Sequence, residues 1–172
     1  MRVEALDAAD YEAAIPELAA LLVDAVDSGS SVNFMAGATT EQTAGWWHAR
    51  VVAVQRGKIT LFVARDDSGR IVGSTLIDRS INPNSPHRAE IGKVLVHSSA
   101  RRQGIATALM TAAEERARSE GRWMLILDTA TGSAAAALYE SLGWQAAGTI
   151  PAYAFTVDGA PESATYYYKD LR

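Results

Sequence analysis

Two carboxylates stand where this sequence could perform acid–base chemistry. Glu90 begins a largely apolar stretch that runs to Val96, and Asp128 directly follows the next apolar run, 124–127. If the two stretches are neighbouring parallel strands, about 4.8 Å apart, both carboxylates can face one cleft. There a carboxylate can accept a proton from an amine, directly or through water, and the negative pair attracts cations. The alternatives are a solvated strand start for Glu90 and a helix cap or turn residue for Asp128.

A second candidate site lies between these two acids in the chain. It follows the apolar residues Val94, Leu95 and Val96 and comprises Arg101, Arg102, Gln103, Gly104, Ile105, Ala106 and Thr107. Helical spacing of apolar residues begins at Ile105, and the first N–H groups of a helix lack intrahelical partners, so they can bind a phosphate. Gly104 permits close approach, no acid lies in the first turn, and two arginines add positive charge. The pattern predicts an anion site, although a plain helix start with surface arginines has similar features.

A third candidate is Tyr139, in the predicted short helix 133–142. A phenol with an unperturbed pKa of about 10 can donate a proton to a leaving group. The alternative is a core tyrosine whose hydroxyl is satisfied. An N–H in the strand around Leu95, left unpaired if the sheet splays there, could stabilise an oxyanion.

Composition and missing motifs exclude several other functions. The glycine patterns of P-loops, dinucleotide folds and hydrolase elbows are absent. There is no cysteine, and the three histidines have no metal-ligand spacing, so we predict no metal site. A net charge of −4 without a broad basic surface argues against nucleic acid as a partner. No signal peptide or apolar span is evident, so we expect a cytoplasmic protein without a membrane partner.

The elements that must position these residues follow from hydrophobic periodicity. We expect an edge strand over 1–6, a helix that starts or bends near Pro16, and a helix from a Thr39–Gln42 capping box to Gly57. Further elements are expected as a hairpin over 59–64 and 71–77, a strand over 90–96, a helix over 104–120, a strand over 123–127, a helix over 133–142, and strands over 144–150 and 164–169. The strand, helix, strand unit around Gly104 implies a right-handed parallel crossover. Together these elements form one mixed α/β domain, 1–172.

The segment 28–38 is rich in Gly and Ser but also carries Phe34 and Met35. These side chains either plug the edge of the core or line a lid over a substrate.

The Arg-x-x-Gly-x-Ala pattern of 101–106 after an apolar strand resembles the pyrophosphate loop of the GCN5-related N-acetyltransferases. The ending from Leu138-Tyr139 to Gly143-Trp144 and the strand order extend this resemblance over about 59–150. It implies a sheet of about seven strands, splayed between the fourth and fifth, with about four flanking helices. It also implies acetyl coenzyme A as the acetyl donor.

A closer likeness covers nearly the whole chain. The segments 31–35, 88–90, 127–129 with 132–133, and 150–153 with 157–159 resemble the tabtoxin-resistance acetyltransferases, to which the kasugamycin acetyltransferases look related. The resemblance implies that Glu90 and Asp128 are general bases and that Tyr139 is a general acid toward the coenzyme sulfur.

The resemblance also implies how the two substrates are held. Val94, Leu95 and Val96 would hold the acetyl and pantetheine end, and 101–107 the pyrophosphate. Many members carry Asn where this chain has Gly132, so a side-chain contact from there must come from Ser133 or be missing. The acceptor would lie among Phe34, Met35, Trp46 and Tyr153.

We therefore expect an N-acetyltransferase that moves acetyl directly to a primary amine of a small polar molecule, such as an antibiotic or toxin, as a monomer or homodimer. Two alternatives are a protein or peptide N-acetyltransferase and a non-catalytic acyl coenzyme A sensor.

Overall fold

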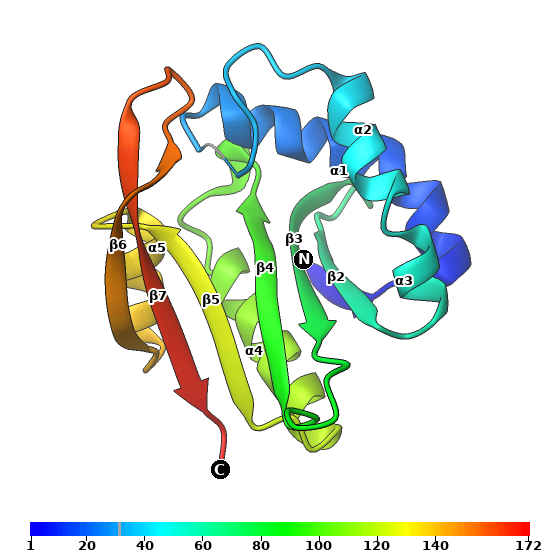
Figure 1. Cartoon of the computed structure of the whole chain (residues 1–172). Coiled ribbons are helices and arrows are strands. Elements are labelled where there is room, and N and C mark those ends of the chain that lie inside the picture. The colour runs from blue at the N-terminus through cyan, green and yellow to red at the C-terminus, as the bar shows by residue number, and fades with distance from the viewer. Residues whose placement is uncertain (31) are drawn as a thin grey trace.

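The computed structural model describes residues 1–30 and 32–172, which adopt a mixed α/β fold around one sheet (Figure 1). Its elements are β1 (Arg2–Ala5), α1 (Ala8–Asp27), α2 (Thr40–His48), α3 (Val51–Gln55), β2 (Ile59–Arg65), β3 (Ile71–Arg79), β4 (Arg88–Val96), a 3₁₀ turn (Ser98–Ala100), α4 (Ile105–Ser119), β5 (Met124–Ala130), α5 (Ala134–Ser141), β6 (Gln145–Phe155) and β7 (Pro161–Asp170).

The seven strands form one mixed sheet in the order β1-β2-β3-β4-β5-β7-β6. β4 and β5 are its parallel pair, and their ladder joins only Arg88–Glu90 with Met124–Ile126. Beyond Glu90 the two strands separate, as Figure 1 shows at the centre of the sheet. The predicted mixed sheet, with its splay between the fourth and fifth strands, is confirmed.

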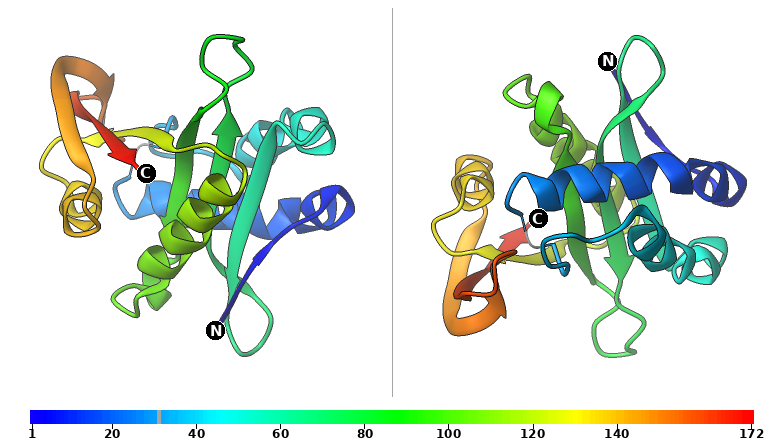
Figure 2. Two further views of the ribbon diagram at one scale, coloured as in Figure 1. Left: turned by 90° about the horizontal axis from the view of Figure 1, so that it is seen from below. Right: turned by 90° about the horizontal axis from the view of Figure 1, so that it is seen from above.

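Helices cover both faces of the sheet, with α1 and α2 on one face and α4 on the other (Figure 2). One core cluster packs α1 to α3 against residues such as Leu61 and Val63 of β2. The other packs α4 and α5 against Leu125 and Leu127 of β5. Alternate strand residues enter opposite clusters because successive side chains of a strand point to opposite faces.

The helices agree with some local predictions and differ from others. Asp7 caps α1 by accepting from the Asp10 N–H at 2.8 Å, so Pro16 lies inside this helix rather than at its start. The Thr39–Gln42 capping box of α2 is confirmed. The helix expected from there to Gly57 is divided at Ala49 and Arg50 into α2 and α3. The break is stabilised because Arg50 Nη1 donates to the last-turn carbonyl of Trp46 at 2.7 Å.

The C-terminal hairpin is longer than the sequence pattern indicates. β6 extends to Phe155, and β7 begins at Pro161. The register of their pairing is irregular between Ile150 and Ala154 of β6. Ala152 has a left-handed φ of 49° there, which interrupts the alternation that marks a strand. Among the described residues, no helix has the length and apolar character needed to cross a bilayer.

Candidate active site

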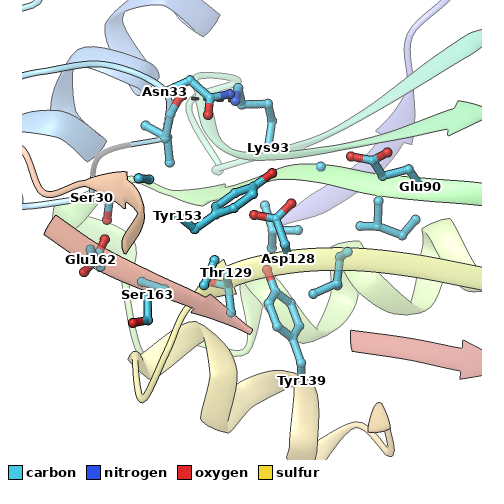
Figure 3. Close-up of a pocket in the computed structure, with 18 of the residues that line it drawn as sticks. Ser30, Asn33, Glu90, Lys93, Asp128, Thr129, Tyr139, Tyr153, Glu162 and Ser163 are labelled. Carbon is cyan, nitrogen blue, oxygen red and sulfur yellow. Dashed lines mark hydrogen bonds between the residues drawn. The ribbon is translucent and has the colours of Figure 1, made fainter. Parts of the chain in front are cut away.

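A cavity of about 320 Å³ opens where β4 and β5 separate, and we call it the acidic cavity (Figure 3). Three carboxylates line it, those of Glu90, Asp128 and Glu162. Its other lining residues are Gly29, Ser30, Val32, Asn33, Ile91, Gly92, Lys93, Val94, Leu127, Thr129, Ala130, Tyr139, Tyr153, Ala154, Ser163 and Ala164. Residues from β4, β5, β6, β7, α5 and the α1–α2 connection thus converge on one space.

Strand alternation places the two predicted bases in this cavity. Ala89 and Ile91 of β4 are buried beneath α4, so Glu90 points to the opposite face of the sheet. In the same way, buried Leu127 turns its neighbour Asp128 toward that face. The structure therefore brings Glu90 and Asp128 together, as the sequence predicts.

The environment of both carboxylates raises their pKa values above the ordinary ones. Desolvation raises the pKa of Glu90 above its ordinary value, and the charges of Asp128 and Asp78 raise it further. Desolvation also raises the pKa of Asp128, against the opposing charge of Lys93. A general base works best when its pKa lies near the working pH, so both shifts suit this role.

Tyr139 of α5 is only 5% exposed, and its ring packs near Trp144 and Tyr167. Its hydroxyl points toward Asp128 (Figure 3) and makes no hydrogen bond with the residues that the structure describes. Burial, and next the charge of Asp128, raise the pKa of Tyr139 above its ordinary value. The phenol therefore stays protonated at neutral pH and can donate a proton into the cavity. The ring serves the core, and the hydroxyl remains free for chemistry.

A second cavity, of about 540 Å³, lies at the N-terminus of α4, and we call it the anion cavity. It is lined by Ala25, Ser30, Val32, Val94, Leu95, Val96, Arg101, Arg102, Gly104, Ile105, Ala106, Thr107, Ala134 and Leu138. Arg102 and Gly104 have positive φ values of 65° and 76°. Such left-handed turns gather successive N–H groups into an anion-binding concavity. The first turn of α4 contains no acid, and a Cβ at Gly104 would meet nothing within 4 Å, so a diphosphate fits here.

The acidic and anion cavities are adjacent, since Ser30, Val32 and Val94 line both of them. They meet along β4 where its ladder with β5 has ended at Glu90, so one edge of β4 faces the cavities. A molecule with its diphosphate at α4 could therefore extend along β4 toward the carboxylates, and backbone N–H groups on this edge could bind an oxyanion.

Some predicted site residues lie elsewhere. Gln103 and Ser133 are not among the residues lining the anion cavity; the Ser133 hydroxyl caps α5 by accepting from the Ala136 N–H at 3.1 Å. Of the predicted acceptor contacts, Tyr153 lines the acidic cavity, but Phe34, Met35 and Trp46 do not. Phe34 and Trp46 are partly buried and pack against the core cluster under α1. Burial of apolar surface in the core stabilises them there.

Sequence reasoning missed six polar residues of the acidic cavity, namely Ser30, Asn33, Lys93, Thr129, Glu162 and Ser163. Lys93 is the one charged residue in the otherwise apolar run 91–96. This interruption is the only feature of the sequence that marks Lys93 as a candidate site residue. Asn33 and Glu162 belong to a connection and a strand end that periodicity does not orient.

Comparisons with known proteins identify a family model, a curated relative and solved structures that are similar to this chain. A family model described as the acetyltransferase (GNAT) family matches residues 30–144. A curated N-terminal acetyltransferase complex ARD1 subunit homolog from Dictyostelium discoideum is 47% identical over 55 residues, which are 32% of this chain and 26% of that protein. The chain thus matches about a quarter of the length of this curated relative.

Two solved structures resemble the whole chain. A ribosomal-protein-alanine N-acetyltransferase from Brucella melitensis has a TM-score of 0.80 and 25% identity, covering 99% of this chain and 100% of that one. A phosphinothricin acetyltransferase from Sinorhizobium meliloti, in complex with AcCoA, has a TM-score of 0.78 and 19% identity, covering 99% of this chain and 89% of that one.

Proposed function

The chain belongs to the acetyltransferase (GNAT) family, since the family model matches more than half of it, and from this premise we propose that it is an N-acetyltransferase. It transfers acetyl from acetyl coenzyme A to a primary amine held in the acidic cavity. The observation that carries the proposal is that the two cavities lie side by side along β4, with Val94 lining both. In the proposed complex a donor bound at α4 extends past Val94 and presents its thioester to an amine beside Glu90 and Asp128.

In this mechanism the chain's own groups handle every proton. Glu90 and Asp128 accept the proton that the acceptor ammonium must lose, directly or through water. The neutral amine then attacks the thioester carbon, so that a C–N bond forms and the C–S bond breaks. The nitrogen loses its second proton as the amide forms, and this proton passes, directly or through water, to Tyr139 and restores the phenol that has protonated the sulfur. N–H groups on the open edge of β4 stabilise the oxyanion, and Tyr139 gives its proton to the departing sulfur. No covalent enzyme intermediate is required.

The anion cavity fits the donor's diphosphate through backbone groups. Arg101 and Arg102 supply positive charge, and the turn around Gly104 supplies N–H donors. Ala134 and Leu138 of α5 offer an apolar wall beside the pantetheine path.

We extend the proposal to an antibiotic or toxin as the acceptor. The support for this step is the resemblance of segments such as 31–35 and 150–153 to the tabtoxin-resistance acetyltransferases. Tyr153, within the second segment, lines the acidic cavity and would contact such an acceptor.

A second candidate is acetylation of protein N-termini. The curated Dictyostelium relative and the Brucella structure, by the names they carry, favour it. The two functions differ in the acceptor, and both use the same donor site and the same carboxylates.

The test measures thiol release from acetyl coenzyme A with a panel of small amines and short peptides. We expect release with small amines, and a loss of about 10²–10⁴-fold in kcat for Glu90→Gln or Asp128→Asn. Calorimetric titration should show that both variants still bind acetyl coenzyme A. Unchanged kcat in both variants would refute the base assignment, whereas binding without thiol release for any amine would identify a sensor.

A further inference from the structure

The acidic cavity contains one cation that acetyl transfer does not require. Among its described lining residues, Lys93 is the single Lys or Arg, opposed by the carboxylates of Glu90, Asp128 and Glu162. Three acids are sufficient to attract an amine. A lysine beside them needs a separate explanation, because withdrawing an ammonium from water is costly.

The structure holds the Lys93 ammonium in a defined place. Its Nζ donates to the Val32 carbonyl at 3.2 Å and lies 4.4 Å from the centroid of the Trp46 ring. The backbone of Lys93 is also fixed, since its carbonyl accepts from Ser74 Oγ at 3.0 Å at a bulge between β3 and β4. The ammonium is therefore positioned before any ligand binds.

Backbone strain accompanies this placement. Val32, Asn33 and Lys93 all have φ values in the left-handed region, at 36°, 74° and 50°. Such conformations are strained for residues other than glycine and cluster where a site requires them. Here they bring the Val32 carbonyl to Lys93 and place Asn33 beside it at the cavity wall (Figure 3).

The ammonium is not neutralised by the part of the protein that the structure describes. No carboxylate there lies within ion-pair distance of Lys93, and an ammonium has three donors, of which Val32 takes one. Desolvation, and next the charge of Arg50 on the same Trp46 ring, lower the pKa of Lys93 to about 8, against the opposing charges of Asp128 and Glu90. An anion placed beside the Lys93 ammonium would offset both its desolvation and its repulsion by Arg50.

From this charge arrangement, and on the basis of the proposed function, we infer that the acceptor is a zwitterion. It is a small primary amine that also carries a carboxylate or similar anionic group. The amine lies at Glu90 and Asp128, and the anion lies at Lys93 and Asn33. A cavity of about 320 Å³ suits a molecule of amino-acid size. Lys93 is then the residue that selects among amines.

The experiment compares matched acceptors that differ only in the anion. Thiol release is measured at saturating acetyl coenzyme A with proteinogenic L-amino acids and with their primary amides. For the acids that are used best, we expect kcat/KM at least tenfold higher than for the corresponding amides. Lys93→Met should bring this ratio close to one through a higher KM for the acids, and Lys93→Arg should keep much of the preference.

Two results would overturn the inference while the proposed function stands. One is equal or better use of the amides by the unmodified enzyme. The other is a Lys93→Met enzyme that loses the same factor with acids and amides, which would mean that Lys93 acts only by holding Asp128 ionised. Retained binding of acetyl coenzyme A shows that the variant is folded. Absence of thiol release with every amine would overturn the proposed function and the inference together.

Discussion

Tyr139 combines a packing role with the chemical role that we propose for its hydroxyl. Its ring contributes to the core beside Trp144 and Tyr167, whereas its hydroxyl faces the acidic cavity. Tyr139→Phe keeps the ring, and the hydroxyl has no partner among the described residues, so we expect unfolding free energy to change by less than about 1 kcal/mol. We expect kcat to fall about 10²-fold.

Chemical denaturation and thiol-release kinetics measure the two quantities separately. Tyr167→Phe is a matched control, because its hydroxyl donates to Glu140 at 2.9 Å and does not line the acidic cavity. A normal kcat in Tyr139→Phe would mean that the residue only packs.

For single residues, the sequence predicts which side chains share one face of the sheet, because side chains alternate between the two faces along a strand. Glu90 and Asp128 each neighbour strand residues whose burial is evident from hydrophobicity, so their common face follows. Lys93 escapes this reasoning because a bulge and a left-handed φ change the direction of its side chain. Trp46 was expected at the acceptor, but hydrophobicity alone does not distinguish a cavity wall from the nearby core that it packs against.

The N-terminus of α4 has a composition that suits the proposed donor at some cost to the helix itself. Acids in the first turn of a helix usually stabilise it by about 0.3–1 kcal/mol, yet α4 has none. Ala106→Asp should therefore leave the protein as stable as before or slightly more so. It should weaken acetyl coenzyme A binding about tenfold or more, roughly 1.4 kcal/mol, because the new carboxylate repels the diphosphate.

Ala106→Asn is the matched control, since it has the same size without the charge. Thermal denaturation measures stability, and calorimetric titration measures affinity. If the Asp and Asn variants bind acetyl coenzyme A equally well, the diphosphate does not lie at this helix end.

Strand pairing sets the charge environment of Glu90. Asp78 of β3 is its direct cross-strand partner, and Lys58 forms an ion pair with Asp78. Asp128 of β5 and Arg88 of β4 complete the charged groups that act on Glu90. Asp78 raises the pKa of Glu90 and Lys58 lowers it.

A base must be deprotonated to act, so the acidic limb of the pH profile of kcat/KM follows the pKa of Glu90. Lys58→Met should raise this pKa and move the limb to higher pH, so that activity is lost earlier on acidification. Asp78→Asn should lower the pKa and move the limb to lower pH. Profiles that do not move, or that move in the same direction, would show that Glu90 is not the titrating base.

Elements whose ends carry a clear signal were predicted well. The capping box at Thr39 and the loop before α4 occur where the sequence indicates. The break between α2 and α3 was not predicted, because no Gly or Pro marks it and the apolar spacing continues through it. The extension of β6 is not predicted either, because its residues are exposed and show no alternation between apolar and polar side chains.

Over the whole molecule, the splayed sheet divides the site between two halves. β1 to β4 supply Glu90 and Lys93, and β5 to β7 supply Asp128, Tyr153 and Glu162. Only a three-residue ladder joins β4 to β5. The order of elements along the chain predicts that β4 and β5 are parallel neighbours, because α4 connects them as a crossover helix. The contents of the acidic cavity are harder to predict, because they depend on long-range contacts between irregular segments.

One such contact joins two segments that each contribute residues to the acidic cavity, and it offers a test between the two candidate functions. The Ala36 N–H of the α1–α2 connection donates to the Val157 carbonyl of the β6–β7 hairpin at 3.0 Å, and the Met35 methyl group lies close to Gly159. Both segments lie together at the upper edge of the molecule in Figure 1. This bridge restricts an extended peptide more than a small amine, so kcat/KM should be at least tenfold higher for small amines than for alanine-initiated peptides.

Removing the bridge tests this interpretation at the same scale. Ala36→Pro deletes the donor N–H, and we expect KM for small amines to rise several-fold because loop and hairpin no longer hold the cavity walls together. kcat should change less, since the carboxylates and Tyr139 lie on other elements. Ala36→Ser keeps the N–H and should behave as the unmodified enzyme. If the unmodified enzyme prefers peptides, or if Ala36→Pro leaves KM unchanged, the bridge does not define the acceptor site and protein acetylation becomes the better assignment.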